Sequence, residues 1–285
     1  MNKDINGVIA VNKEKGMTSF DVVHEISKIF DTKKVGHTGT LDPMAEGVLL
    51  VCIGKATKIV ELLTSNEKEY IAEVKLGIET DTLDTEGKVL KEESIPDNLD
   101  IKRIIDSYNG KTYMQEVPKY SAIKVNGKKL YEYARNNLEV ELPKKEVTIK
   151  SIELIDYKDD YFKFKCLVTK GTYIRSLIRD ICFDLNTIGT MNSLIRTKQG
   201  NIDIKDTYKL SDIRNGNYKL IDIEDLLDYD VVVVDKEIEY KISNGVRLDN
   251  IWNINSRVIF KNNNNQLLGI YEKDGDKLKT WKNFI

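Results

Sequence analysis

The sequence predicts an α+β protein in which a large mixed domain is followed by a small β module. Strand-like and helix-like segments follow one another without the regular strand–helix–strand rhythm of a doubly wound fold. The length of 285 residues suggests about two domains. An acidic run over 222–235 precedes a tail, 236–285, of short strand-like segments with Asn- and Gly-rich turns. We therefore place a domain boundary at this run.

The first part of the chain alternates between apolar segments and structure breakers. GVIAVNK at 7–13 is predicted to be a strand. Thr18 and Ser19 are N-cap residues that precede apolar side chains at helical spacing, so a helix is expected there. Those apolar side chains are Phe20, Val22, Val23, Ile26, Ile29 and Phe30. Residues 33–47 form a loop rich in breakers, and the apolar run at 48–53 follows as a buried strand.

The next segments are shorter. A helix is expected at about 55–64. EYIAEVKLGI at 69–78 alternates between apolar and polar residues, which predicts a strand. The acidic DTLDTEG at 81–87 is a turn, and a short helix spans 101–108.

The second half predicts further mixed structure. A strand at 120–125 and a helix at 128–137 come first. Residues 147–157 and 161–169 form a hairpin through a Lys-Asp-Asp turn. A helix at 172–185 follows, with Tyr173 in its first turn.

The composition is that of a folded protein. Hydrophobic residues make up 41% of the chain and charged residues 32%, with 44 basic against 46 acidic side chains. Disorder usually combines low hydrophobicity with a large net charge, so it is not expected. No apolar run approaches the ~18 residues of a membrane span, and the N-terminus lacks a signal-peptide pattern. We therefore expect a cytoplasmic protein without a membrane segment.

The charges are unevenly distributed. The sequence pI of 5.9 argues weakly against a nucleic-acid partner, because such domains are often basic. Residues 119–150, however, carry eight basic and four acidic side chains, whereas 222–235 carries six acids and no base. A chain of this kind can still present a basic face.

A metal site is not expected. The chain has two histidines, no CxxC motif and no HExxH motif. Its three cysteines are far apart, so buried thiols are favoured over disulfides. They are Cys52, Cys166 and Cys182.

Two motif-like segments are discarded. IGKAT at 53–57 resembles the end of a phosphate loop but lacks its first Gly and its Ser or Thr. DTLDTEG resembles a calcium loop, but Asp81 and Asp84 are three residues apart instead of two, and the closing Glu is absent.

The most informative segment is GHTGTLDPMAEG at 36–47. Its glycines permit backbone shapes that other residues resist, and Pro43 restricts Asp42 to extended conformations. The loop can thus hold Asp42 at a fixed angle above the buried strand. Asp-Pro also starts many ordinary turns, and alone the motif favours that simpler interpretation.

Three other stretches have both a functional and an ordinary interpretation. Tyr70 can stack on a base or lie in the core. Arg175, two residues after an aromatic side chain, can pair with a carboxylate of a site or form a surface ion pair. Residues 120–135 interleave tyrosines with lysines, which suits RNA or an amphipathic helix with a solvated face.

Together these motifs resemble the bacterial tRNA pseudouridine synthases of the TruB family, which modify uridine 55 in the T-loop. The resemblance covers about residues 7–200 in the family's order. Its segments are GVIAVNKEKGMTS from residue 7, GHTGTLDPMAEGVL from 36, KEY from 68, GxxTDTxDxEG from 77, QEVPKYSAIKVNGKKLYEYAR from 115, KGTYIRSLIRD from 170 and SLIRT from 193. Glu14 and Val117 stand where the family usually has proline. Both lie in predicted loops, and neither is a candidate catalytic group.

The resemblance implies a pseudouridine synthase fold, with a mixed, mainly antiparallel sheet flanked by helices and loops. The catalytic domain would span 1–230, with a thumb-like insertion at about 118–145 that closes on the T-loop. The tail at 236–285 resembles, more weakly, a PUA-type RNA-binding module. Transfer RNA is the implied partner, no cofactor or metal is implied, and a monomer is expected.

The resemblance also implies roles for the site residues. Asp42 matches the essential aspartate, which acts as a nucleophile or charge stabiliser, and Arg175 is the opposite charge that keeps it ionised. Tyr70 would stack on the uracil of the flipped nucleotide and help move the C5 proton. His37 matches a residue on the RNA path, and Tyr173 and Leu194 match the pocket wall.

Two alternatives differ in class. A non-catalytic RNA-binding or tRNA-remodelling protein could use the same surface, but it would have little need of Asp42, Tyr70 and Arg175 together. A glycosidase would need a second carboxylate as an acid–nucleophile partner, and the motifs offer one candidate.

Overall fold

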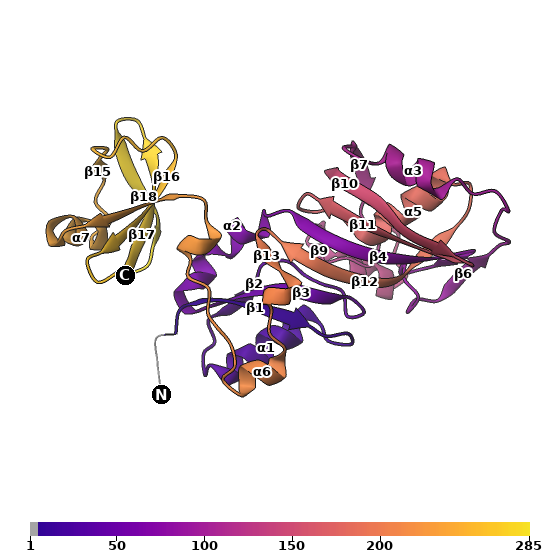
Figure 1. Cartoon of the computed structure of the whole chain (residues 1–285), viewed down its shortest axis with the longest axis horizontal. Helices are drawn as coiled ribbons and strands as arrows, with labels where there is room; N and C mark the ends of the chain where they lie inside the picture. The colour runs from indigo at the N-terminus through magenta and orange to yellow at the C-terminus, as the bar shows by residue number, and fades with distance from the viewer. Residues whose placement is uncertain (1–4) are drawn as a thin grey trace.

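The computed structural model describes residues 5–285 and contains a large central sheet and a smaller C-terminal sheet (Figure 1). Residues 1–4, which open the predicted catalytic domain, lie outside the described residues. The main path of the central sheet has the order β1-β3-β12-β4-β11-β10-β7, with β2 added on β3 and β13 on β12. Their bounds are β1 Gly7–Lys13, β2 Val35–His37, β3 Glu46–Ile53, β4 Lys68–Leu76, β7 Thr112–Glu116, β10 Lys144–Lys158, β11 Tyr161–Val168, β12 Gly189–Gln199 and β13 Ile202–Asp203.

The central sheet is mixed but mainly antiparallel, which confirms the predicted fold class. The parallel pair is β12 with β3, where Arg196 lies beside Gly47. Two small hairpins lie outside the central sheet. They are β5 (Ile78–Thr80) with β6 (Val89–Glu92), and β8 (Lys124–Val125) with β9 (Lys128–Lys129).

Helices cover the sheet and build separate apolar cores. One core joins β4, β10, β11 and β12 to the helices α3 and α5. Another joins β1 and β3 to the helices α1 and α6. The helical segments of the central domain are α1 Ser19–Ile29, η1 Gly54–Ile59, α2 Val60–Thr64, α3 Ile101–Ser107, α4 Leu130–Arg135, α5 Ile174–Asp184, η2 Ile204–Asp206, α6 Leu210–Arg214 and η3 Glu224–Leu226, the η segments being 3₁₀ helices. No helix within 5–285 is both long enough and apolar enough to cross a membrane.

Several predicted elements are present as expected. Helix α1 starts with a capping box: the Thr18 hydroxyl accepts from the Asp21 amide at 3.0 Å, and the Asp21 carboxylate accepts from the Thr18 amide at 2.8 Å. The hairpin of β10 and β11 forms, and Asp159 takes the positive φ of its turn. The three cysteines are buried.

Other predicted elements were wrong in extent or type. The strand expected at 120–125 is confined to Lys124–Val125, because residues 120–122 form bends. The helix expected at 55–64 begins as a 3₁₀ turn, and Tyr173 is the N-cap of α5 instead of part of its first turn. Strands β7 and β12 were not predicted from the sequence. Strand β12 carries buried polar side chains that a hydrophobic-periodicity argument cannot recognise.

The C-terminal sheet has the order β14-β16-β17-β18-β15 and is accompanied by helix α7. Its elements are β14 Asp230–Val234, α7 Lys236–Ser243, β15 Leu248–Asp249, β16 Arg257–Asn262, β17 Leu267–Asp274 and β18 Lys277–Asn283. Because β14 pairs with β16, this sheet begins inside the acidic run, before residue 236.

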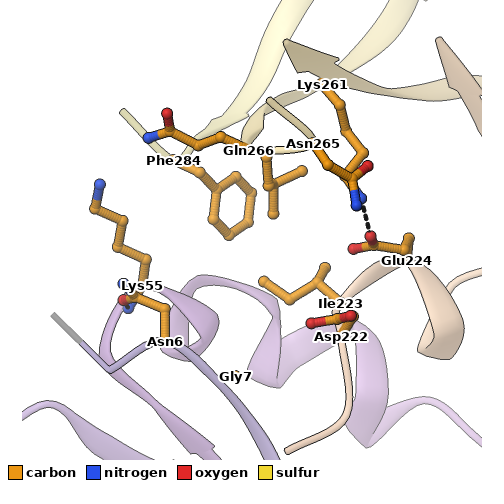
Figure 2. Close-up of a pocket in the computed structure, with 11 residues that line it drawn as sticks. Asn6, Gly7, Lys55, Asp222, Ile223, Glu224, Lys261, Asn265, Gln266 and Phe284 are labelled. Atoms are coloured by element: carbon orange, nitrogen blue, oxygen red, sulfur yellow. Dashed lines mark hydrogen bonds and ion pairs between the residues drawn. The ribbon is translucent and has the colours of Figure 1, made fainter. Parts of the chain in front are cut away.

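The C-terminal sheet packs against the end of the central domain that carries α2, far from α3 (Figure 1). Ile259, Ile270 and Phe284 join the apolar core beneath β1 and β3. A cavity of about 240 Å³ lies at this junction. Figure 2 shows residues that line it, among them buried Lys261 and its ion-pair partner Glu224. The junction therefore holds the two parts together by apolar contact and by charge.

Candidate active site

The loop that carries Asp42 lies between β2 and β3 and is anchored at several backbone positions. The Ser19 hydroxyl donates to the Leu41 carbonyl at 3.2 Å and accepts from the Leu41 amide at 2.8 Å. The Gly16 amide donates to the Pro43 carbonyl at 2.8 Å. The Asp42 carbonyl closes a turn with the Ala45 amide at 3.0 Å. Asp-Pro thus starts a turn, and the turn is part of a fixed loop.

Gly47 lets this loop return to the sheet. Its φ is +101°, and a Cβ at this position would lie 2.2 Å from the Arg196 carbonyl oxygen. Neither the backbone conformation nor the space suits a side chain.

We expect Gly47→Ala to lower the free energy of unfolding by about 2–5 kcal/mol, because backbone strain adds to overlap with a neighbouring strand. Thermal or urea unfolding measures this. Gly110→Ala is the matched control: φ is +73° there, but a Cβ would meet nothing within 4 Å. Equal losses in the two variants would show that contact with β12 does not matter.

Arg175 holds Asp42 through an ion-pair contact and a hydrogen bond. Arg175 is the second residue of α5, and its Nε lies 2.9 Å from Oδ2 of Asp42, while its Nη2 lies 3.2 Å from Oδ1. The arginine side chain is 6% exposed, whereas that of Asp42 is 34% exposed. The arginine of the pair is therefore enclosed by the protein, whereas the carboxylate of Asp42 is partly accessible to solvent.

Further contacts fix the guanidinium of Arg175. Its Nη1 donates to the Thr82 carbonyl at 2.8 Å, and its Nη2 donates to the Tyr120 carbonyl at 3.0 Å. Asp84 lies 3.6 Å from Nη1. A planar fork with several donors suits this arrangement, and lysine could not replace it.

Burial raises the pKa of Asp42 above its ordinary value. Arg175 opposes this effect, and the nearby carboxylate of Asp84 adds to it. The ion pair expected from the sequence is present, but desolvation outweighs it. Asp42 therefore becomes ionised at a higher pH than a free aspartate.

Tyr70 lies on β4 and is buried at 6% exposure. It is opposite Arg196 of β12 and Cys166 of β11 in the strand register. Its ring belongs to the same apolar core as Leu41 and Leu194. Burial raises the pKa of Tyr70, and Asp42 contributes to this rise, so the hydroxyl stays protonated near the carboxylate. The sequence left core and site as alternatives for Tyr70. The structure places its ring in the core, and its role in the reaction stays a prediction.

Tyr173 and His37 are the two other aromatic residues that the sequence assigned to the site. Burial raises the pKa of Tyr173, and Arg175 and Asp42 act on it electrostatically, so it belongs with the pair. His37 ends β2, and its Nδ1 accepts from the Gly39 amide at 3.3 Å. Burial and Arg196 lower the pKa of His37, which favours a neutral ring. The structure thus brings Asp42, Arg175, Tyr70, Tyr173 and Leu194 together and holds His37 at the start of the same loop.

Three charged residues of the site were not singled out from the sequence. Asp84 lies in the acidic turn and faces Arg175. Lys13 is 1% exposed and donates to the Met17 and Pro43 carbonyls, and burial lowers its pKa to about 8. Arg196 is fully buried and donates to the Val48 and Gly39 carbonyls. A charged residue inside a predicted strand is the signal that could have identified Lys13, because buried charges are rare, whereas Arg196 lies on a strand that was not predicted.

The basic and aromatic stretch at 120–135 forms the β8–β9 hairpin and α4. Lys129 and Arg135 lie over the Tyr131 ring at 5.3 Å each. The Tyr120 hydroxyl donates to Asp81 at 3.2 Å. Part of the stretch is thus occupied by internal contacts, whereas Lys124 and Lys128 are exposed.

In the part of the chain that the structure describes, no group of three or more His, Cys, Asp or Glu side chains is arranged to hold a metal ion. The donor set around Asp42 consists of a guanidinium, carboxylates and aromatic side chains. Such a set suits acid, base or nucleophilic chemistry.

Comparison with known proteins gives consistent matches. Residues 27–174 match the family model described as TruB family pseudouridylate synthase (N terminal domain). The chain is 42% identical over 282 residues to tRNA pseudouridine synthase B of Caldanaerobacter subterraneus subsp. tengcongensis, covering 96% of this chain and 98% of the relative. It is 43% identical over 275 residues to tRNA pseudouridine synthase B of Clostridium tetani, covering 95% and 93% of the two chains.

Solved structures share the fold at low identity. A chain of a Cbf5-Nop10-Gar1 complex matches with a TM-score of 0.72 and 23% identity, covering 98% of this chain and 85% of the other. A chain of an H/ACA RNP bound to a substrate RNA containing 2'-deoxyuridine matches with a TM-score of 0.71 and 22% identity, covering the same shares. The likeness spans both sheets of the present fold.

Proposed function

The chain belongs to the TruB family of pseudouridylate synthases, and from this premise we propose that it converts uridine 55 in the T-loop of transfer RNA to pseudouridine. The two relatives compared above are named tRNA pseudouridine synthase B. The single observation that carries the chemistry is the two-point grip of Arg175 on Asp42 in a fixed loop. Because each carboxylate oxygen of Asp42 contacts a different nitrogen of Arg175, the carboxylate is held in one orientation.

The reaction is an isomerisation. The N-glycosidic bond breaks, the uracil turns, and a carbon–carbon bond forms between C5 and the ribose. The C5 proton leaves and N1 gains one, so the atoms balance without water or an electron acceptor. No cofactor is required for this balance.

Asp42 supplies the anionic oxygen that the reaction needs at the sugar or the base. Arg175 aligns it, and the exposed side of Asp42 is the side that a nucleotide can approach. The same carboxylate serves both bond-breaking and bond-forming steps if it attacks covalently and is later displaced. Asp84 takes part through its ion pair with Nη1 of Arg175, a nitrogen that does not contact Asp42.

The target nucleotide must leave the RNA stack to reach Asp42. Unstacking costs a few kcal/mol, and stacking on Tyr70 together with hydrogen bonds offsets it. Tyr173 and Leu194 close the wall of the pocket, and His37 stands on the RNA path. In this proposal the Tyr70 hydroxyl, which burial keeps protonated, relays the C5 proton: it gives its own proton to an acceptor as it takes the one from C5.

The thumb at about 118–145 and the C-terminal module complete the RNA surface in this proposal. Arg175 donates a hydrogen bond to the carbonyl of Tyr120, near the start of the thumb, and so connects the thumb to the Asp42–Arg175 pair. A monomeric state, a cytoplasmic location and RNA binding by the module stay predictions.

The proposal is tested by tritium release from C5-labelled uridine in unmodified tRNA. We expect release by the purified protein and a pseudouridine product at one position of the T-loop. Free uracil would indicate a glycosidase instead. Tight tRNA binding without tritium release would indicate a non-catalytic RNA-binding protein.

The salt dependence of tRNA binding tests the thumb. Because Lys124 and Lys128 are exposed, we expect them to contact phosphates. The double variant Lys124→Gln/Lys128→Gln should reduce the slope of log Kd against log salt by about one to two, since each phosphate contact contributes roughly 0.7–0.9. Single-turnover chemistry at saturating enzyme should remain nearly intact.

The matched control is Lys28→Gln/Lys33→Gln, which removes the same charge near α1. Its slope should equal that of the wild type. If both double variants change the slope equally, the thumb makes no special contact with RNA.

A further inference from the structure

Gln115, near the end of β7, is a buried polar residue that the proposed mechanism does not use. Its side chain is 1% exposed, and both ends of its amide are paired. Its Oε1 accepts from the backbone amide of Tyr173 at 2.8 Å, and its Nε2 donates to the Tyr113 hydroxyl at 2.9 Å. Gln115 therefore joins the edge strand of the central sheet to the start of α5.

Asp180, Tyr113, Gln115 and Tyr173 are joined by successive hydrogen bonds, and the donor of each bond can be assigned. The Tyr113 hydroxyl has one hydrogen, which it donates to Oδ2 of Asp180 at 3.0 Å. Burial and Asp180 raise the pKa of Tyr113, so that hydrogen is retained. The Tyr113 oxygen must then accept from the amide nitrogen of Gln115, which turns the amide oxygen toward Tyr173. The amide orientation thus follows from the network.

The hydrogen bond between Gln115 and Tyr173 lies at the N-terminus of α5. Tyr173 is the N-cap of α5 and provides no side-chain cap of its own. Backbone amides at a helix start lack partners within the helix, and Gln115 supplies one. Arg175 lies two residues further on and carries both contacts with Asp42.

A neighbouring contact strengthens the same junction. The Ser176 hydroxyl donates to the Glu116 carbonyl at 2.8 Å, and Arg179 pairs with the Glu116 carboxylate at 2.9 Å. Consecutive residues of β7 thus hold the first two turns of α5. Ser176 is next to Arg175 in the sequence, and Gln115 holds the N-cap residue Tyr173; the side chains of Ser176 and Gln115 are both buried.

We propose that Gln115 is a positioning residue for the reaction, which fixes the start of α5 so that Arg175 meets Asp42 with both nitrogens. This inference rests on the proposed function of the Arg175–Asp42 pair. Loss of the Gln115 contact lets the first turn shift, and the guanidinium then aligns the carboxylate less well. Since Arg175 lowers the pKa of Asp42, a weaker contact also lets that pKa rise further.

The test is single-turnover tritium release across pH for Gln115→Leu, beside tRNA binding and a melting curve. Misplacement of a reacting group by about 1 Å can cost roughly 10²-fold in rate, so we expect a loss of about 10–100-fold at saturating enzyme. The Kd for tRNA should stay within about threefold, since no RNA contact is removed. The acid limb of the rate profile should move to higher pH, which a purely structural loss would not cause.

Asn262→Leu is the matched control. Asn262 is also buried, and its amide donates to Oε1 of Glu239 at 3.0 Å and accepts from the Gln266 backbone amide at 3.0 Å, in the C-terminal sheet and away from both α5 and the Asp42 loop. It should lower the melting temperature but leave the acid limb where it is. Tyr113→Phe is a milder second variant, which frees the Gln115 amide and should shift the acid limb in the same direction.

Equal rate losses in Gln115→Leu and Asn262→Leu, with unchanged pH profiles, would overturn the proposal. So would an unshifted acid limb in Tyr113→Phe if Gln115→Leu does not fold. Failure of the proposed function would look different. The wild type itself would then release no tritium.

Discussion

Replacing Asp42 by asparagine is expected to abolish pseudouridine formation while tRNA binding stays within about threefold of the wild type. The amide keeps the shape of the carboxylate but lacks the charge and the nucleophilic oxygen. Arg175 keeps its contacts with the Thr82 and Tyr120 carbonyls and with Asp84, so the pocket should retain its form. Single-turnover tritium release and filter binding measure the two effects separately.

The melting temperature of Asp42→Asn is not expected to fall markedly. Because the folded state raises the pKa of Asp42, the ionised carboxylate costs stability above that pKa, and a neutral amide removes this cost. Turnover above about a few per cent would rule out a covalent nucleophile at this position. Loss of binding in proportion to turnover would show a structural role instead.

Replacing Tyr70 by phenylalanine is expected to slow the chemical step by roughly 10²–10⁴-fold, which is the usual contribution of a general acid or base. The ring stays in the core with Leu41 and Leu194, so stacking and tRNA binding should persist. The loss of one buried hydroxyl should cost only about 1 kcal/mol of stability. Tyr70→Leu should also weaken capture of the flipped base, because it removes the stacking plane.

Tyr271→Phe is the matched control. Tyr271 is a fully buried tyrosine of the C-terminal sheet, whose hydroxyl donates to the Val246 carbonyl at 3.3 Å. It should show a similar change in melting temperature without a change in rate. If Tyr70→Phe is as fast as the wild type, the hydroxyl has no chemical role and the ring alone matters. If both Tyr70 variants melt early and lose activity in proportion, Tyr70 is a core residue only.

The local sequence determined much of the secondary structure. Thr18 and Asp21 are close enough in the chain to cap α1 by themselves, and Asp159 sits in a hairpin turn short enough to be read from the residues. Elements that depend on distant partners were missed. The edge strand β7 is stabilised by β10, and β12 is stabilised between β3 and β4. Their residues show no periodicity that indicates a strand without those neighbours.

In the candidate site, too, some features could be predicted from the sequence and others depend on residues that are distant in the chain. The motif around Asp42 and the order of the other motifs identified the family and named the residues of the pair from the sequence alone. Only the tertiary structure decided how they act together, because Asp42 and Arg175 are 133 residues apart and meet through the packing of α5 on the sheet. It also decided that burial outweighs Arg175 in setting the pKa of Asp42, that Asp84 lies beside Arg175, and that Gln115 bonds the start of α5. Desolvation and hydrogen-bond direction depend on what surrounds a side chain in space, and the order of residues does not contain that information.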